Sequence, residues 1–327
     1  MGLFSLRAPF ARMSGRRPIR AVALALAAWA WLPGAARAAE IKTVGVIVAD
    51  LGNPFFENIA RGVEDVVKRL VGPAVKVSVR SSGYDLDRQI RQIDQMAKEK
   101  TDLLILSAVD TEQIEPAVRR AEEAGVAVVA VDVRAMGAQA SVTSDNIGAG
   151  AVACRYLAGK LRGMGDVLIL NGPPVSSVIE RVYGCRRTLA AFPRIHVLSD
   201  NDDGGGSIEG GLSYMTEAMA KYARIDAVFA INDPTAIGAD IAASRAGRSD
   251  FFIVSIDGSP RGADLLRRGG TRLVGTVVQD PVQMVERAVA LGLKLFERRP
   301  IQEIDSVIPV YLLTSDTVGE YSGWNRQ

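Results

Sequence analysis

The feature that most constrains the fold of this chain is a regular alternation between short apolar runs and longer amphipathic runs. The apolar runs are rich in Val, Ile and Leu, as in strands buried on both faces, and the runs between them show helical spacing. Strands that alternate with helices form parallel βαβ units with right-handed crossovers. Because the alternation starts again after residue 144, the sequence predicts an α/β fold of two doubly wound parallel-sheet units.

Each apolar run predicts a strand, and each amphipathic run predicts a helix. After a first strand that begins at residue 44, we expect strands at 75–79, 103–106, 126–131, 167–170, 196–198, 227–230, 252–256, 273–278 and 307–313. We expect helices from residue 54 and at 85–100, 111–124, 148–161, 177–191, 209–222, 233–246 and 281–296. The irregular segment 200–206 lacks the ligand spacing of a calcium loop, so we expect a flexible surface turn there.

The transition from the first strand to the first helix carries the first candidate site residues. Gly52, Asn53 and Pro54 end the strand; Asn53 can cap the helix, and Pro54 suits its first turn. We therefore expect Asn53, Phe55 and Phe56 at the carboxyl end of a strand, where open α/β sheets bind ligands. Two aromatic rings beside an amide suit a sugar, which has apolar C–H faces and a rim of hydroxyls. The alternative is that both Phe residues are core.

The first 39 residues have the features of a secretory signal peptide. They contain six arginines and no acid, an apolar block at residues 21–32 and an Ala-Arg-Ala site at residues 36–38. We expect cleavage near residue 38 or 39 and a periplasmic location, with the Sec and Tat routes both open. The whole chain has 39 basic and 37 acidic residues; without the six arginines, 33 remain against 37, a net charge of −4. This balance does not favour a nucleic-acid partner.

Cysteine and histidine are scarce in this chain. Cys154 and Cys185 both fall in expected helices, and export makes a disulfide between them chemically possible. Because sequence does not show whether their Cα atoms approach within bonding range, we favour two buried thiols over a disulfide. With one His and two Cys, the chain does not favour a metal site, and no motif indicates a cofactor.

Polar side chains follow several of the expected strands, at the point where each strand ends. In doubly wound sheets these positions converge on one crevice. Amides both donate and accept hydrogen bonds, carboxylates accept, and arginine donates, so together they can satisfy the hydroxyls of a polyol. The alternative is that each residue only caps a helix or turns a loop. The candidates of this kind are Asp132, Arg134, Arg181, Asn232, Asp257 and Gln279.

The chain resembles the bacterial periplasmic ribose-binding proteins over residues 41–313. The matching motifs, in the family's order, are Asn53-Pro54-Phe55-Phe56, Val131-Asp132, Ser144-Asp145-Asn146, Glu180-Arg181, Asn232-Asp233, Ile256-Asp257-Gly258 and Gln279. The resemblance implies two lobes joined by three chain crossings, with a monosaccharide bound in the cleft between them. The N-terminal lobe would comprise residues 40–144 and 280–310, and the C-terminal lobe residues 145–279 and 311–327.

The resemblance also implies roles for the candidate residues. Phe56, with Phe55, would stack on one face of the sugar, while the hydroxyls would bond to the polar side chains: Asn53, Asp132, Arg181, Asn232, Asp257 and Gln279. Two departures leave the ligand open among a pentose, a hexose, a polyol and a cyclitol. The family has an Arg directly after the Asp, whereas this chain has Asp132-Val133-Arg134. It also has an aromatic near the place of Gly204-Gly205-Gly206, so we expect a roomier pocket there. Trp324, the only Trp after residue 39, lies outside the resemblance.

These observations predict a monomeric transport receptor that delivers a sugar or polyol to the membrane permease of an ABC importer. A periplasmic sensor for a membrane kinase or chemoreceptor is the alternative. A secreted glycosidase is disfavoured, because hydrolysis needs two carboxylates at a defined separation and the sequence shows no positioned acid–base pair. We therefore do not expect an enzyme.

Overall fold

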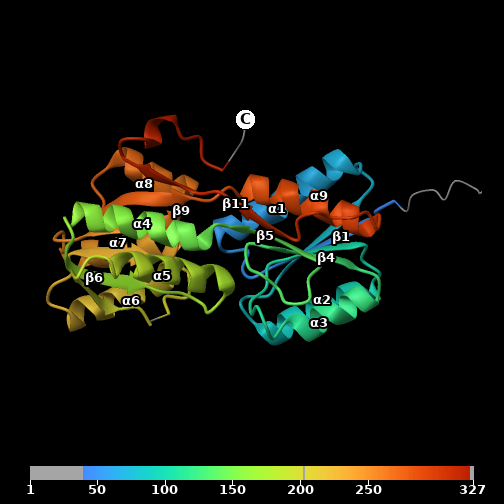
Figure 1. Cartoon of the computed structure of the whole chain (residues 1–327), viewed down its shortest axis with the longest axis horizontal. Helices are drawn as coiled ribbons and strands as arrows, with labels where there is room; N and C mark the ends of the chain where they lie inside the picture. The colour runs from blue at the N-terminus through green and yellow to red at the C-terminus, as the bar shows by residue number, and fades with distance from the viewer. Residues whose placement is uncertain (1–39, 202, 325–327) are drawn as a thin grey trace, which may run out of the picture. The chain divides into compact units, whose positions relative to one another are not determined.

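The computed structural model describes residues 40–201 and 203–324. The expected signal peptide, at residues 1–39, lies outside the described residues. The described chain forms two six-stranded sheets, each with helices on both faces (Figure 1). The predicted α/β fold with two doubly wound lobes is therefore confirmed. We call the sheet that holds the first strand, with its helices, the N-terminal lobe, and the other the C-terminal lobe.

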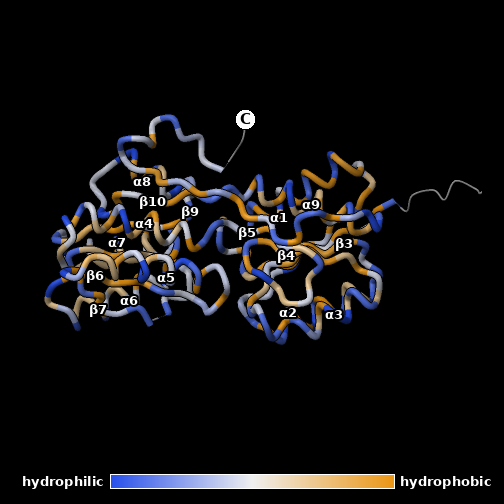
Figure 2. Tube along the Cα trace, viewed as in Figure 1, coloured by the Kyte–Doolittle hydropathy of each residue, from blue (hydrophilic) through white to orange (hydrophobic). Residues whose placement is uncertain are grey.

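The sheet of the N-terminal lobe is entirely parallel, in the order β11-β5-β4-β3-β1-β2. Its strands are β1 (Thr43–Val48), β2 (Lys76–Ser81), β3 (Leu103–Leu106), β4 (Ala127–Val131), β5 (Ala140–Ser144) and β11 (Asp305–Ile308). One face packs against α1 (Pro54–Leu70) and α9 (Pro281–Phe296), and the other against α2 (Leu86–Lys98) and α3 (Glu115–Glu123). Because both faces are covered, the central strands are apolar along their length (Figure 2).

The sheet of the C-terminal lobe has the order β12-β10-β9-β8-β6-β7 and is parallel except for β12. Its strands are β6 (Met164–Leu170), β7 (Arg194–Ser199), β8 (Ala227–Ala230), β9 (Phe252–Asp257), β10 (Leu273–Val278) and β12 (Tyr311–Thr314). One face packs against α4 (Asn146–Lys160) and α5 (Ser176–Leu189). The other packs against α6 (Ile208–Lys221), α7 (Asp233–Arg245) and α8 (Pro260–Arg268), and a 3-10 turn, η1 (Val318–Glu320), follows β12.

The chain passes between the lobes three times. It leaves the N-terminal lobe after β5, returns after β10 to form α9 and β11, and leaves again between β11 and β12. The connection from β10 to α9 explains why the last long helix covers the first sheet although it follows a strand of the second. Lobe boundaries after residues 144, 279 and 310 stay a prediction, with which this connectivity agrees.

Three elements differ from the sequence-based expectation. The single strand expected at 307–313 is two strands, β11 and β12, that belong to different sheets. Pro309 lies at the break, where its missing N–H suits the end of a ladder. The strand β5 was not expected, because its sequence, Ala-Ser-Val-Thr-Ser, mixes polar and apolar residues although all five are buried. The short helix α8 was also missed.

The expectation of two buried thiols is wrong. Cys154 on α4 and Cys185 on α5 form a disulfide, with their Cα atoms 5.1 Å apart. Two glycines allow this close approach: a Cβ on Gly150 would lie 1.9 Å from the carbonyl oxygen of Arg181, and one on Gly184 would lie 2.1 Å from that of Ile147. The two helix backbones therefore touch, which the sequence alone could not show.

Candidate ligand-binding site

Eight of the nine candidate residues line one cavity, and the ninth, Arg134, does not. The eight are Asn53, Phe55, Phe56, Asp132, Arg181, Asn232, Asp257 and Gln279. They come from both lobes, at or just after the carboxyl ends of β1, β4, β8, β9 and β10 and from the first half of α5. Since parallel strands present their carboxyl ends at one edge of a sheet, this topology gathers residues that are far apart in the sequence.

The two asparagines of the cavity also cap helices. Oδ1 of Asn53 accepts from the N–H of Phe55 at 3.0 Å, and Oδ1 of Asn232 accepts from the N–H of Thr235 at 2.9 Å. Nδ2 of Asn232 donates to the carbonyl of Gly206 at 2.8 Å. The capping interpretation and the site interpretation therefore apply to the same residues, because a helix that starts at a strand end places its cap at the cavity.

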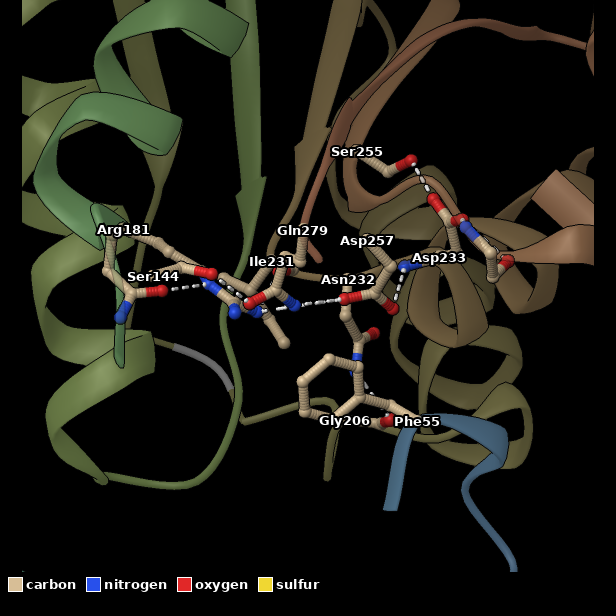
Figure 3. Close-up of polar contacts among 12 residues, drawn as sticks. Phe55, Ser144, Arg181, Gly206, Ile231, Asn232, Asp233, Ser255, Asp257 and Gln279 are labelled. Atoms are coloured by element: carbon tan, nitrogen blue, oxygen red, sulfur yellow. Dashed lines mark hydrogen bonds and ion pairs between the residues drawn. The ribbon is translucent and has the colours of Figure 1, made fainter. Parts of the chain in front are cut away.

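A hydrogen-bonded chain runs through the carboxylate of Asp257 (Figure 3). The hydroxyl of Ser144 donates to Oε1 of Gln279 at 2.9 Å, and Nε2 of Gln279 donates to Oδ1 of Asp257 at 2.8 Å. The other oxygen, Oδ2, accepts from the N–H of Asp233 at 3.2 Å. Nη1 of Arg181 lies 4.0 Å from Oδ1. Asp257 is thus held by Gln279 and the N–H of Asp233, with Arg181 nearby.

The guanidinium of Arg181 is buried and fixed by two further acceptors. Its Nε donates to Oδ1 of Asn146 at 2.9 Å, and its Nη1 donates to the carbonyl of Ile231 at 3.0 Å. Asn146 is the first residue of α4, and α4 is joined to the helix of Arg181 by the disulfide. The planar guanidinium group of Arg181 is therefore oriented by α4, by α5 and by the residue that follows β8.

Behind Asp257 lies a second carboxylate, Asp233, which is completely buried. It accepts from the hydroxyl of Ser255 (Figure 3). It also accepts from the hydroxyls of Ser259 and Thr276, the latter at 2.7 Å, and from the N–H of Ser259 at 2.8 Å. Burial raises the pKa of Asp233, although these hydrogen bonds oppose the shift. Burial and the negative charge of Asp233 also raise the pKa of Asp257, with Arg181 opposing.

The carboxylate of Asp132, at the end of β4, has fewer partners. It is 5% exposed, and its Oδ1 is buried without a hydrogen-bond partner among the described residues. Burial raises its pKa to about 6, with Arg181 opposing the shift. Its φ is +65°, and that of Asp257 is +140°, in regions that cost non-glycine residues conformational energy. Both site carboxylates are thus held in unusual backbone conformations, as is common at functional sites.

Arg134 takes part in a contact between the lobes. Its guanidinium pairs with the carboxylate of Glu180 on α5, and its backbone N–H donates to the hydroxyl of Ser176 at 2.9 Å. The side chain is therefore directed at the other lobe and is not among the residues that line the cavity. Its expected role in ligand binding stays a prediction that the geometry does not support.

Tyr84 is a cavity residue that the sequence analysis missed. It follows β2 with a φ of +57°, and its hydroxyl lies 3.9 Å from the position that a Cβ on Gly206 would take. Segment 200–206 is thus more than a surface turn, because Gly206 lines the cavity and bonds to Asn232. The signal was an aromatic residue just past a strand end, as at Phe55.

Trp324 is also part of the surroundings of the site, although it lies outside the resemblance. Its Nε1 donates to the carbonyl of Asp257 at 3.0 Å, and its ring meets that of Phe55 edge-on, with centroids 5.6 Å apart. Phe55 meets Phe56 in the same manner at 5.7 Å. Phe55 is therefore held between two rings, which fixes the aromatic wall of the cavity.

The cavity is small, with a volume of about 40 Å³. A second cavity, of about 560 Å³, lies on the side of Gly206, and Asn53, Tyr84, Gly206 and Asp257 line both cavities. Pockets for small organic ligands typically measure roughly 300–1,000 Å³. The contact of Tyr84 with Gly206 and the pair of Arg134 with Glu180 bring the lobes together around the cavity. A ligand the size of a sugar therefore fits the smaller cavity only if the lobes separate.

The described residues set limits on other kinds of site. Over residues 40–201 and 203–324, no group of three or more His, Cys, Asp or Glu side chains is arranged to hold a metal ion. Within the same ranges, no helix has the length and apolar character needed to cross a bilayer. The chemistry that the cavity offers is hydrogen bonding, charge pairing and contact with aromatic rings.

Comparisons with known proteins agree with this geometry. Residues 44–299 match the model of the periplasmic binding protein domain. The ribose import binding protein of Escherichia coli (strain K12) is 28% identical over 270 residues, which cover 82% of this chain and 89% of that protein. The xylitol-binding protein of Mycolicibacterium smegmatis is 28% identical over 283 residues, 85% of this chain and 79% of that protein. The structure is similar to that of a periplasmic solute-binding protein of an ABC transporter from Actinobacillus succinogenes, which was solved with bound D-allose. The TM-score is 0.78 at 24% identity, and the match covers 86% of this chain and 100% of that protein's chain.

Proposed function

Because the chain belongs to the family of periplasmic binding proteins, we propose that it captures a monosaccharide or polyol between its lobes and delivers it to an ABC-type importer. One observation carries this proposal: side chains from both lobes converge on a single cavity. They supply carboxylates, amides, one guanidinium and a wall of aromatic rings. Two relatives of the chain are an import binding protein for ribose and a binding protein for xylitol, which supports a hydroxylated ligand.

The geometry suggests how such a ligand is held. One face of the sugar lies against Phe56, whose ring is supported by Phe55. Its hydroxyls bond to Asn53, Asp132, Arg181, Asn232, Asp257 and Gln279. An analogue that lacks one hydroxyl leaves a buried polar group of the protein unpaired, which costs affinity. The residues need only to bind, so we infer a binding protein and no enzyme.

Transport then works through a shift between two conformations. A ligand that contacts both lobes favours the closed state, because the open state offers it only part of these contacts. The closed state presents to a membrane permease a surface that is assembled from both lobes. We infer that the chain is exported to the periplasm through residues 1–39 and acts as a monomer, with lobe boundaries after residues 144, 279 and 310. The sensor alternative has less support, since one of the relatives is an import binding protein.

A thermal-shift screen with pentoses, hexoses, polyols and inositols tests the proposal. A ligand that binds only the native state raises the melting temperature by mass action. We expect at least one hydroxylated compound to raise it in the wild type and, at the same concentration, to raise it less in Arg181→Ala. A matched control is Arg120→Ala, which removes a surface arginine paired with Asp94 far from the cavity. If no compound of these classes shifts the folded wild type, the proposal fails.

A further inference from the structure

The charges at the cavity do not balance. Among the described residues that line it, Asp132 and Asp257 carry carboxylates and Arg181 is the one cation. The carboxylate of Asp233 lies directly behind Asp257, whose Oδ2 accepts from the Asp233 N–H at 3.2 Å. Asp132, Asp233 and Asp257 are each at most 5% exposed. The buried shell thus holds three carboxyl groups and, among the residues that line the described cavity, one cation; a carboxylate that ionises there without a cation beside it is costly in a low-dielectric interior.

Arg181 is already engaged on the side of Asp257. Its Nε and Nη1 donate to Asn146 and to the carbonyl of Ile231, and the nearest carboxylate oxygen of Asp257 is 4.0 Å away. Asp132 has no ion pair with it within 4 Å, and the Oδ1 of Asp132 is buried without a hydrogen-bond partner among the described residues. A buried carboxylate oxygen without a partner points to one supplied from outside the chain.

The chain offers no other cation to Asp132 among the residues that line the described cavity. Arg134, two residues further on, pairs with Glu180 and does not line the cavity. Val133, which does line it, is apolar. Tyr84 also lines this part of the cavity; burial, and after it the negative charges of Asp132, Asp50, Asp257 and Asp203, raise the pKa of its phenol. Arg181 is thus the one positive charge that acts on Asp132 among the residues lining the described cavity, and it lowers the pKa of that carboxyl without pairing with it directly.

We propose that the ligand of this site is a hydroxylated ring that carries a positive charge, such as an amino sugar or an aminocyclitol, with its ammonium group against Asp132. This inference rests on the proposed function and narrows its ligand class. The ammonium pairs with the carboxylate of the N-terminal lobe, while the ring hydroxyls bond to the network of Asp257, Gln279 and Arg181. A neutral sugar can donate a hydroxyl to Asp132, but it leaves the charge of that residue uncompensated.

Matched pairs of compounds test this proposal directly. We suggest calorimetry at pH 7.5 with D-galactose and D-galactosamine, D-glucose and D-glucosamine, D-ribose and 3-amino-3-deoxy-D-ribose, and myo-inositol and its monoamines. N-acetyl derivatives serve as neutral nitrogen controls. For the best-binding scaffold, we expect the amine to bind about tenfold to hundredfold more tightly than its hydroxyl counterpart, as is typical of a close charge pair. Acetylation should abolish this preference.

The variant Asp132→Asn separates the charge from the shape of the side chain. Asn tolerates a positive φ as Asp does, so the fold should be kept, and thermal unfolding checks this. We expect Asp132→Asn to weaken the binding of both members of a pair, but that of the amine more, by the whole factor of the preference, so that the preference for the amine vanishes. The surface variant Asp94→Asn, which also removes one negative charge, should keep the preference.

Each outcome of this experiment decides between the two proposals. If neutral sugars bind as tightly as their amines, or if Asp132→Asn keeps the preference, the inference of a cationic ligand is wrong and the sugar-receptor proposal stands. If neither member of any pair binds the folded wild type, both proposals fail. A preference for the amine that depends on Asp132 supports both.

Discussion

The two sides of the cavity differ in how completely the protein satisfies its own polar groups. On the C-terminal side, Asp257, Gln279 and Arg181 bond to one another or to neighbouring groups, and Asp233 stands behind them with hydroxyl partners of its own. On the N-terminal side, Asp132 keeps a buried oxygen without a partner among the described residues. The comparison indicates that one side is organised before the ligand arrives and the other is completed by it.

The sheet topologies account for this difference. Asn232, Asp257 and Gln279 lie at or just after the ends of β8, β9 and β10, which are adjacent strands. Asp257 therefore reaches both Gln279 and the N–H of Asp233, the residue after Asn232. Asn53 and Asp132 follow β1 and β4, which are separated by β3. Adjacent strand ends make a network possible, whereas separated strand ends leave each polar group to be satisfied by the ligand.

The largest expected effect concerns Asp233, which supports the C-terminal side of the cavity. The variant Asp233→Ala leaves the buried donors of Ser255, Ser259 and Thr276 without an acceptor. We expect the free energy of unfolding to fall by about 3–5 kcal/mol, measured by urea unfolding at pH 7. Asp94→Ala, a surface control, should cost less than about 1 kcal/mol. A loss below about 1 kcal/mol for Asp233→Ala would show that the network does not stabilise this side.

The disulfide is the next test, because it ties together the two helices that hold Arg181. Cys154 and Cys185 are 31 residues apart, and closing a loop of that length in the unfolded chain is worth about 3.7 kcal/mol in the chain-entropy model. We expect the double variant Cys154→Ala/Cys185→Ala to lower the free energy of unfolding by about that amount and to weaken ligand binding. Reduction of the wild type should reproduce both effects. An unchanged denaturation midpoint in the double variant would contradict the account.

The role of Arg181, on the C-terminal side of the cavity, can be tested by measuring ligand binding to its variants. In Arg181→Ala the ligand loses a buried charged donor, so the dissociation constant should rise at least about tenfold, or about 1.5 kcal/mol, in calorimetry. Arg181→Lys should recover only part of the affinity, because an ammonium cannot reproduce the planar fork. Equal affinities of Arg181→Ala and wild type would remove this residue from the site.

The smallest expected effect concerns Asp132, on the N-terminal side of the cavity. Unlike the others, it is a gain in stability. Burial raises the pKa of Asp132 to about 6 in the folded protein, so folding favours the protonated carboxyl. The stability that this residue contributes is therefore fully present below about pH 4 and is lost as the pH rises through about 6. Asp132→Asn should therefore raise the free energy of unfolding at pH 7 by about 1 kcal/mol without ligand, with little effect at pH 4. Because Asp233 and Asp257 titrate in both proteins, the difference between the two curves isolates Asp132. A loss of stability at pH 7 would contradict the comparison.

The sequence predicted the architecture and most of the candidate site because both follow from local patterns. The apolar runs mark buried strands, and polar residues just after them mark the binding edge, so Asn232, Asp257 and Gln279 could be identified. Contacts that depend on tertiary packing could not be. The disulfide depends on two glycines that let α4 and α5 touch, and Trp324 reaches Phe55 from beyond the last strand. Arg134 follows a strand end like the others, yet its side chain pairs with Glu180 of the other lobe.

Trp324 also provides the most direct test of the central claim, that the ligand binds in this one cavity. It is the only tryptophan after residue 39, and it contacts both Phe55 and the backbone of Asp257. In a titration of the exported chain with the best ligand of the screen, we expect its fluorescence to change and to saturate at one ligand per chain, with the dissociation constant found by calorimetry. Calorimetric binding that leaves the emission of Trp324 unchanged, and that Arg181→Ala does not weaken, would place the ligand elsewhere and contradict the account.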